Sequence, residues 1–308
     1  MKTSARACPL PIPPPQTGEG SPPQCPPDKE GDAAQAIDKA HVFAANRAVG
    51  RVALAVKTAD GRTRRARVHE HGSLRVRFPN GDGSQLDAVL VNTAGGIAGG
   101  DRFGVDVSVG EGARLSVTTT AAEKVYRSLG PEAALDVTLD VAAGGTLHWL
   151  PQETILFDEV ALRRTIAVDL AADATLLLAE AVVFGRSAMG ETVTHGHFFD
   201  RWRVRRSGRL IFAEAVRLDG AMAQLLADAA AAAGGVAIAT VLLTPGDDAN
   251  VAAVRALADT FVGEVGISAF NGMVVARLCA RDGAALRHDL SAVLSTLARG
   301  ALPRLWLN

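Results

Sequence analysis

Two glutamates at matching places in the sequence have the clearest potential for chemistry. Glu180 lies in LLLAEAVVF and Glu214 in LIFAEAVRL, so each carboxylate has alanines and larger apolar residues around it. In a stack of β units, matching positions of consecutive units form a ladder, which predicts that the two carboxylates are neighbours. If they face outward, they are simply solvated. If they face inward, they need a cation or water, which predicts a wet interior that attracts cations.

A glycine-rich loop, NTAGGIAGGD at 92–101, places a third carboxylate, Asp101. A dinucleotide site would need a helix after the loop, but the strand pattern VDVSV follows, and no Gly-Lys-Ser/Thr is present. Glycine tolerates positive φ and close backbone approach, so we interpret the loop as a structural turn that places Asp101. The glycines of this turn are Gly95, Gly96, Gly99 and Gly100.

The stretch TTTAAEKVYRSLG at 118–130 has the composition of a protein interface. It carries Lys124, Arg127 and the single tyrosine of the chain, Tyr126. Tyrosine and arginine are favoured interface anchors, so these three residues are candidates for partner contact. The alternative is an ordinary solvated strand end.

Other metal and nucleophile patterns are weaker. Two His-x-His pairs, His69 with His71 and His195 with His197, could each present two imidazoles on one face of a strand. Neither pair has a nearby cysteine or a well-spaced third ligand. The chain has no G-x-S-x-G, no H-E-x-x-H and no cysteine paired with a histidine, which argues against an enzyme.

An internal repeat indicates the elements that position these residues. Three windows align without gaps at spacings of 32 and 29 residues: VDVSVGEGARL at 105–115, VTLDVAAGGTL at 137–147 and IAVDLAADATL at 166–176. A looser copy, WRVRRSGRL, ends 34 residues later at Leu210. Strand-turn-strand repeats of about 30 residues predict a mainly β fold, a β-helical or solenoid-like stack.

Helical periodicity appears only in the last third of the chain. It predicts helices near 221–233, 247–263 and 284–300 within a single β-helical domain that spans residues 48–308. Nine of the fourteen prolines of the chain lie before Asp28, which predicts that residues 1–40 are a disordered extension.

Composition restricts the class of protein. The net charge of −1 argues against binding of nucleic acid or an anionic membrane. The three cysteines (Cys8, Cys25 and Cys279) form no disulfide framework. No run is long enough to span a bilayer, and no signal peptide is recognisable, so we expect a cytoplasmic protein.

Five motifs in this order resemble the urease accessory protein UreD family, called UreH in some organisms. They are NTAGGIAGGD, TTTAAEKVYRS, LPQETILF at 150–157, EAVVFGRSAMGE at 180–191 and LPRLW at 302–306. The resemblance covers the chain from about residue 48 to its end and leaves out the proline-rich extension.

The resemblance implies a β-helical nickel-delivery chaperone that is not an enzyme. Proteins of this kind form a complex with UreF and UreG, dock on apo-urease and help to pass nickel from the UreG GTPase to the urease active site, through an internal channel. The resemblance therefore implies Ni²⁺ bound transiently, no tightly bound cofactor, and a dimeric arrangement within the accessory complex.

Oxygen ligands along a wet passage would hold Ni²⁺ less tightly than a His/Cys cage. The expected channel or metal contacts are Asp101, Glu180 and Glu214, followed by Glu191 and Glu153. Arg304 and Trp306 of the last motif are further interface candidates. The competing hypothesis is a β-helical carbohydrate-active enzyme that uses clustered carboxylates.

Overall fold

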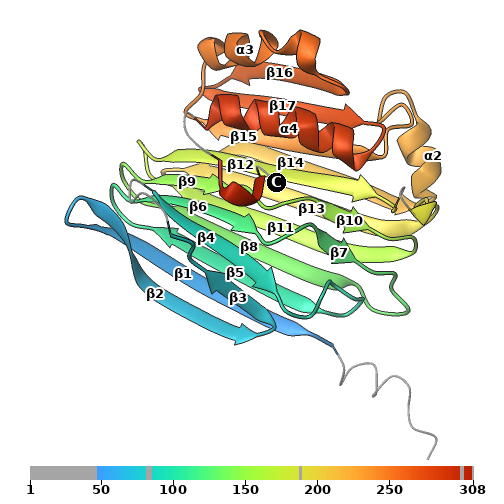
Figure 1. The fold of residues 1–308 in the computed structure, drawn as a ribbon, viewed down its shortest axis with the longest axis horizontal. Coiled ribbons are helices and arrows are strands. Elements are labelled where there is room, and N and C mark those ends of the chain that lie inside the picture. The colour runs from blue at the N-terminus through green and yellow to red at the C-terminus, as the bar shows by residue number, and fades with distance from the viewer. Residues whose placement is uncertain (1–46, 81–84, 187–188, 299–301, 307–308) are drawn as a thin grey trace, which may run out of the picture. The chain divides into compact units, whose positions relative to one another are not determined.

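Two β-sheets face each other across a shared hydrophobic core (Figure 1). The computed structural model describes residues 47–80, 85–186, 189–298 and 302–306, which belong to one compact unit. The extension predicted for residues 1–40 lies outside the described residues.

Seven strands form the first sheet and ten the second. The seven-stranded sheet has the order β14 (Arg209–Gly220), β13 (Gly196–Arg206), β11 (Val160–Leu170), β8 (Ala133–Val141), β5 (Arg102–Val109), β1 (Val49–Ala59) and β2 (Arg62–Gly72). The ten-stranded sheet has the order β16 (Glu264–Phe270), β17 (Met273–Ala280), β15 (Ala237–Thr244), β12 (Thr175–Phe184), β9 (Thr146–Trp149), β6 (Arg114–Thr119), β4 (Leu86–Asn92) and β3 (Leu74–Arg77). Short strands β10 (Thr154–Leu156) and β7 (Glu123–Val125) pair with each other, and β10 also pairs with β12.

The sequence repeat corresponds to the coil of a β-solenoid. In each of the three aligned windows, a strand of the seven-stranded sheet turns into a strand of the ten-stranded sheet: β5 into β6, β8 into β9 and β11 into β12. Each turn is closed by the same backbone bond, from Ala113 to Gly110, from Gly145 to Ala142 and from Ala174 to Ala171. Like strands of successive coils pair in parallel. The predicted mainly β, solenoid-like fold is confirmed, with about four turns.

The fourth, looser copy of the repeat does not form a coil. β13 and β14 make an antiparallel hairpin within the seven-stranded sheet, closed by Ser207 and Gly208. Both residues have positive φ, 49° and 78°, which is the geometry of a tight hairpin turn. Glu214 on β14 and Glu180 on β12 are therefore in different sheets, and the prediction that they form a ladder was wrong.

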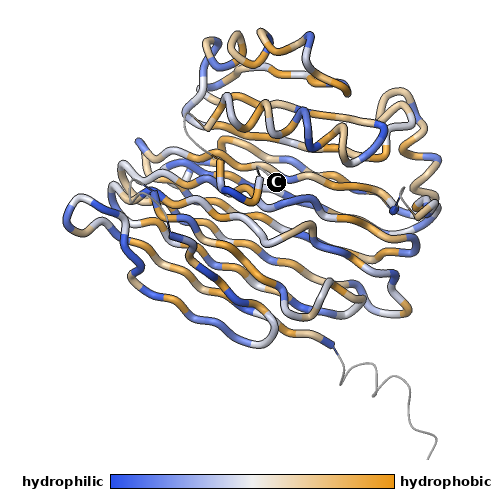
Figure 2. Tube along the Cα trace, viewed as in Figure 1, coloured by the Kyte–Doolittle hydropathy of each residue, from blue (hydrophilic) through white to orange (hydrophobic). Residues whose placement is uncertain are grey.

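Side-chain burial follows the strand period. In β8, buried and exposed side chains alternate from Val137 to Val141, as Figure 2 shows for many strands in alternating hydropathy colours. β12 is buried on both faces. Leu176 and Leu178 point into the core between the sheets, whereas Leu177 and Ala179 pack on the opposite side, toward a second core beneath the helices. This explains the continuous apolar run around Glu180.

The helices lie in the last third of the described chain, as predicted, but their bounds differ. They are α2 (Met222–Ala227), α3 (Asp248–Arg255) and α4 (Gly283–Leu297), with short 3-10 turns η2 (Ala258–Thr260) and η3 (Arg304–Trp306). α3 and α4 begin at acidic caps, because Asp247 accepts from the Asn250 backbone N–H and Asp282 from that of Ala285.

The helix predicted near 221–233 is only six residues long. Asp228 leaves the helical conformation, and its side chain accepts from the Ala230 backbone N–H, which forms a local turn in place of another helical turn. Within the described ranges, no helix is long and apolar enough to cross a membrane.

Candidate functional site

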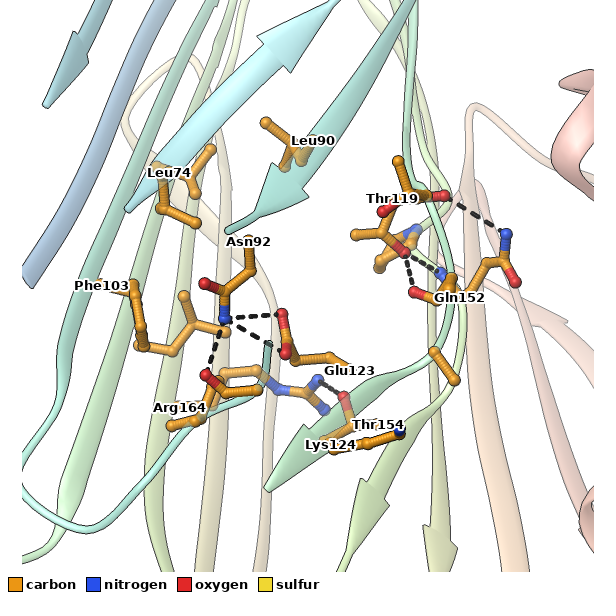
Figure 3. A pocket seen from close by; sticks show the side chains of 18 of the residues that line it. Leu74, Leu90, Asn92, Phe103, Thr119, Glu123, Lys124, Gln152, Thr154 and Arg164 are labelled. Carbon is orange, nitrogen blue, oxygen red and sulfur yellow. Dashed lines mark hydrogen bonds between the residues drawn. The ribbon is translucent and has the colours of Figure 1, made fainter. Parts of the chain in front are cut away.

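A cavity of about 270 Å³ lies between the two sheets, next to the glycine loop. Much of its wall is apolar and comes from residues such as Leu90, Phe103 and Leu162. Polar side chains from both sheets and from the short strands also reach it, and Figure 3 labels Asn92, Thr119, Glu123, Gln152, Thr154 and Arg164 among them. Glu180 lines the cavity as well. The cavity therefore combines apolar walls with a few convergent charged groups, as small-ligand and ion sites commonly do.

Glu123 and its neighbours form the end of the cavity nearest the glycine loop. The Asn92 side-chain amide donates to both carboxylate oxygens of Glu123, at 3.3 Å each, and to the Gly96 carbonyl at 2.9 Å. Burial raises the pKa of Glu123 to about 7, against the opposing effect of the Asn92 bond. Lys124, the next residue, is exposed and also lines the cavity. The half-buried carboxylate of Glu123 is therefore followed in sequence by the solvated ammonium of Lys124.

Arg164 is the centre of a buried cluster that also lines this cavity. Arg164 is only 1% exposed. Its guanidinium donates to Glu180 from β12 and, at 2.6 Å, to Asp200 from β13. Two tryptophans complete the cluster: the indole of Trp149 donates to Glu180 at 2.8 Å and that of Trp202 to Asp200 at 3.2 Å.

The cluster holds two carboxylates and one permanent cation in a water-poor region. The pKa of Glu180 is raised to about 7, chiefly by burial; the attraction of Arg164 opposes this rise and the Asp200 charge adds to it. The two carboxylates raise the pKa of Arg164. Two buried polar atoms of this cluster, Nε of Arg164 and Oδ1 of Asp200, have no hydrogen-bond partner among the described residues. The cluster therefore keeps unused capacity on both a donor and an acceptor.

A second, smaller cavity of about 20 Å³ continues on the other side of this cluster. Among the residues that the structure describes, Arg164 and Glu180 alone line both cavities. Glu214 lines the smaller one and pairs with Arg277 of β17 at 2.6 and 3.0 Å. The Glu214 side chain is 8% exposed and that of Arg277 60%, so this ion pair reaches the surface. The two glutamates singled out in the sequence thus border the same small space from opposite sheets.

Asp101 has a different place from the one predicted, because it does not line either cavity. Its two oxygens accept from the backbone N–H groups of Ala48 and Ala98, both at 2.8 Å. Asp101 is 3% exposed and ties the glycine loop to the chain that leads into β1. It acts in this structure as a buried acceptor for backbone donors.

Steric crowding explains why the loop has glycine at two of its positions. Gly96 has a φ of +146°, and a Cβ there would lie 2.4 Å from the ring of Tyr126. A Cβ on Gly99 would lie 2.1 Å from the Ser128 hydroxyl. The tyrosine in turn donates its hydroxyl to the Gly95 carbonyl at 2.8 Å and packs edge-on against Phe157. Tyr126 therefore supports the loop, which also forms part of the cavity wall.

The two lower-ranked carboxylates also lie outside both cavities. Glu191 pairs with Arg186 at 2.6 Å on the surface. Glu153 is 7% exposed and accepts from Arg287 of α4 at 3.1 Å. Glu153 therefore anchors the helical layer to the sheet.

The interface candidates divide into exposed and buried residues. Lys124, Arg127 and Arg304 are exposed, although Arg127 lies 3.5 Å from Glu159. Trp306 is 3% exposed, and its indole donates to the Leu150 carbonyl at 2.9 Å. Its ring does not present a surface for a partner, because it packs within the second core.

One histidine of the two pairs lies near carboxylates: His197 is 3.1 Å from Glu132 and 3.3 Å from Asp219, at a partly exposed position. Across the residues that the structure describes, no group of three or more His, Cys, Asp or Glu side chains could hold a metal ion.

The sequence analysis missed Glu123 as a cavity residue, and it missed Arg164 and Asp200 altogether. A signal was present for the latter two. In VALRRTIAVDL the inward positions are Val160, Leu162, Arg164, Ile166 and Val168, and in HFFDRWRV they are Phe198, Asp200, Trp202 and Val204. One charge of each sign therefore interrupts an inward apolar pattern on adjacent strands, which predicts a buried pair. Glu123 follows a loop, where no such period applies.

Comparison with known proteins gives consistent matches. The model of a family described as UreD urease accessory protein matches residues 48–307. A urease accessory protein UreD of Rhodopseudomonas palustris strain HaA2 is 62% identical over 267 residues, which cover 87% of this chain and 96% of the relative. A second from strain BisA53 is 60% identical, covering 88% and 95%. Urease accessory protein UreD 3 of Bradyrhizobium sp. strain BTAi1 is 56% identical, covering 87% and 97%.

Replacement of Asp101 by alanine should destabilise the fold. Asp101→Ala leaves the Ala48 and Ala98 N–H groups without their acceptor, so we expect the free energy of unfolding in urea to fall by about 3 kcal/mol. Asp106→Ala on β5, which breaks a surface pair with Arg51, should cost less than about 1 kcal/mol. Equal losses in the two variants would contradict the structural role of Asp101.

Glu123 should make stability depend on pH. Its pKa of about 7 in the fold exceeds the ordinary value of 4.5, so its contribution to stability is fully present below pH 4.5 and is lost as pH rises through 7. Glu123→Gln removes this loss. The variant should gain about 2 kcal/mol relative to wild type between pH 5 and pH 8 in urea unfolding. Parallel pH curves for Glu123→Gln and wild type would refute the assignment, and the exposed Glu111→Gln serves as control.

Proposed function

The chain belongs to the UreD family of urease accessory proteins, which function in urease maturation, and we propose that it is the component through which Ni²⁺ passes to apo-urease. In this proposal the metal arrives from the UreG GTPase by way of UreF. The metal is cargo, held transiently, and the protein has no tightly bound cofactor.

The pair of adjoining cavities carries the proposal. One cavity is lined by Glu123 and Lys124 beside the glycine loop, and the other is lined by Glu214, whose ion-pair partner Arg277 is exposed. Between them lies Glu180, which lines both. Carboxylates thus occur at both ends and at the middle of a path through the space between the sheets.

The ligand chemistry suits transfer. Nickel binds imidazole and thiolate sites tightly, so a conduit made of them would retain its cargo, whereas single carboxylates separated along a path hold the ion weakly. We assign the transient contacts to Glu123, Glu180 and Glu214. Asp101, Glu153 and Glu191 are left out of the route because none of them lines either cavity.

The same proposal assigns the partners and the setting. We infer that the chain acts in the cytoplasm, within a complex with UreF, UreG and apo-urease that contains two copies of it. Lys124, Arg127 and Arg304 are the exposed basic residues that we assign to partner contact. Exposed arginines and lysines near a cavity opening also suit docking to an acidic surface.

We further infer that the protein is not an enzyme. Its relatives are named as accessory proteins, and no catalytic family is indicated. The carbohydrate-active alternative needs two carboxylates free to act on a sugar. Here Glu180 and Asp200 are both bound to Arg164, which argues against that role.

Neutralisation of the path should impair nickel delivery. In a urease-positive cell that lacks its own copy of this gene, the variant Glu123→Gln, Glu180→Gln, Glu214→Gln should give at least tenfold less urease activity than wild type at limiting nickel. The physical reason is the loss of oxygen ligands with charge along the path. Co-purification with UreF, UreG and urease should persist.

The matched control replaces three exposed carboxylates: Glu111→Gln, Asp169→Asn and Glu264→Gln. It should stay within twofold of wild type. Unchanged activation by the path variant at limiting nickel, with the complex intact, would rule out the proposed route.

A further inference from the structure

Arg164 lies at the one place where the two cavities meet. Arg164 and Glu180 are the only residues shared by the two linings, so anything that moves from one cavity to the other must pass between or beside them. Asp200 borders the smaller cavity on the same side. The guanidinium donates to a carboxylate from each sheet, Glu180 and Asp200.

The position between these two carboxylates is a cation position. Two buried carboxylates need a positive charge between them, and Arg164 supplies it here. A guanidinium is charged at every accessible pH, so its repulsion of an approaching metal ion does not depend on protonation. As long as it remains, a divalent cation cannot occupy the same place.

We propose that Arg164 is the gate of the nickel path, an inference that rests on the proposed function. Its guanidinium closes the passage because it fills the place between Glu180 and Asp200 that a passing Ni²⁺ would take. Passage requires exchange of one cation for the other. The gate determines which state of the chain admits metal, and it is separate from the ligands that carry the metal.

The cluster has the features of a contact that can be exchanged. Nε of Arg164 and Oδ1 of Asp200 are buried without a partner, so the pair does not use its full hydrogen-bonding capacity. The larger cavity of about 270 Å³ adjoins Arg164 directly and gives the side chain room to turn. Figure 3 shows that the Arg164 guanidinium and the Glu123 carboxylate border this same cavity, which offers the displaced cation an acidic surrounding.

The test is whether metal can replace the guanidinium. We compare the untagged full-length wild type with Arg164→Met, which removes the charge but keeps an unbranched apolar side chain. Isothermal titration with NiCl₂ should reveal one Ni²⁺ per chain in Arg164→Met that wild type lacks, with a Kd at least tenfold below any wild-type binding. Arg164→Lys keeps the charge and should resemble wild type.

The triple variant Arg164→Met, Glu180→Gln, Asp200→Asn removes the carboxylates and should lose the added binding. Ni²⁺ should also raise the Tm of Arg164→Met but not that of the triple variant, because a ligand that binds only the folded state stabilises it. Equal nickel binding by Arg164→Met and wild type would overturn the gate.

The experiment remains decisive if Arg164→Met does not fold in the absence of metal. If Arg164→Met unfolds without metal because two carboxylates lose their cation, refolding in NiCl₂ supports the gate. Failure to refold in NiCl₂, while the triple variant folds, overturns it. Complementation separates the two proposals. If the wild-type gene does not restore urease activity, the proposed function is refuted. If it restores activity but Arg164→Met binds no metal, only the gate is refuted.

Discussion

The need to neutralise one buried arginine governs the centre of this molecule. Arg164 points inward from β11 into a space otherwise filled by leucine, valine and aromatic side chains. A charge in such a place is tolerated only when ion pairs and hydrogen bonds replace its water. Glu180 and Asp200 do so from the two opposing sheets, and this contact holds the sheets in register around a polar centre. Both cavities border this polar centre.

Acidic residues have two distinct roles in this fold. Asp101, Glu153 and Asp289 accept from backbone donors or from a helix arginine, and they hold loops and α4 in place. Glu123, Glu180 and Glu214 instead line the spaces between the sheets. Both groups are buried or half-buried, so burial alone does not separate them. Position separates them: the first group lines neither of the two cavities, whereas each member of the second group borders one.

The departure from the repeat produces the second end of the path. After three solenoid coils the chain makes the β13–β14 hairpin, so β14 remains in the seven-stranded sheet. The ten-stranded sheet continues instead with β15, which pairs with β12 and places Thr240 opposite Glu180. Thr240 also donates to Glu214 across the gap at 3.3 Å. The end of the solenoid is thus a place where polar side chains of both sheets meet, next to the exposed Arg277.

The sequence by itself determined the coil, the turn positions and the family, because period-2 alternation and a 30-residue repeat are local properties that survive without knowledge of contacts. It also identified Glu180 and Glu214 as unusual, since each interrupts an apolar run. The strand period in the sequence also predicts the inward positions of Arg164 and Asp200. Only the tertiary structure decided which sheet each strand joins, because the Ser207–Gly208 turn sends the chain back as a hairpin where the earlier turns send it across. Partner choice among charged groups depends on that assignment. For this reason Asp101 became a backbone acceptor, Trp306 a core residue and Glu123 a cavity residue, although their neighbours in sequence gave no sign of it.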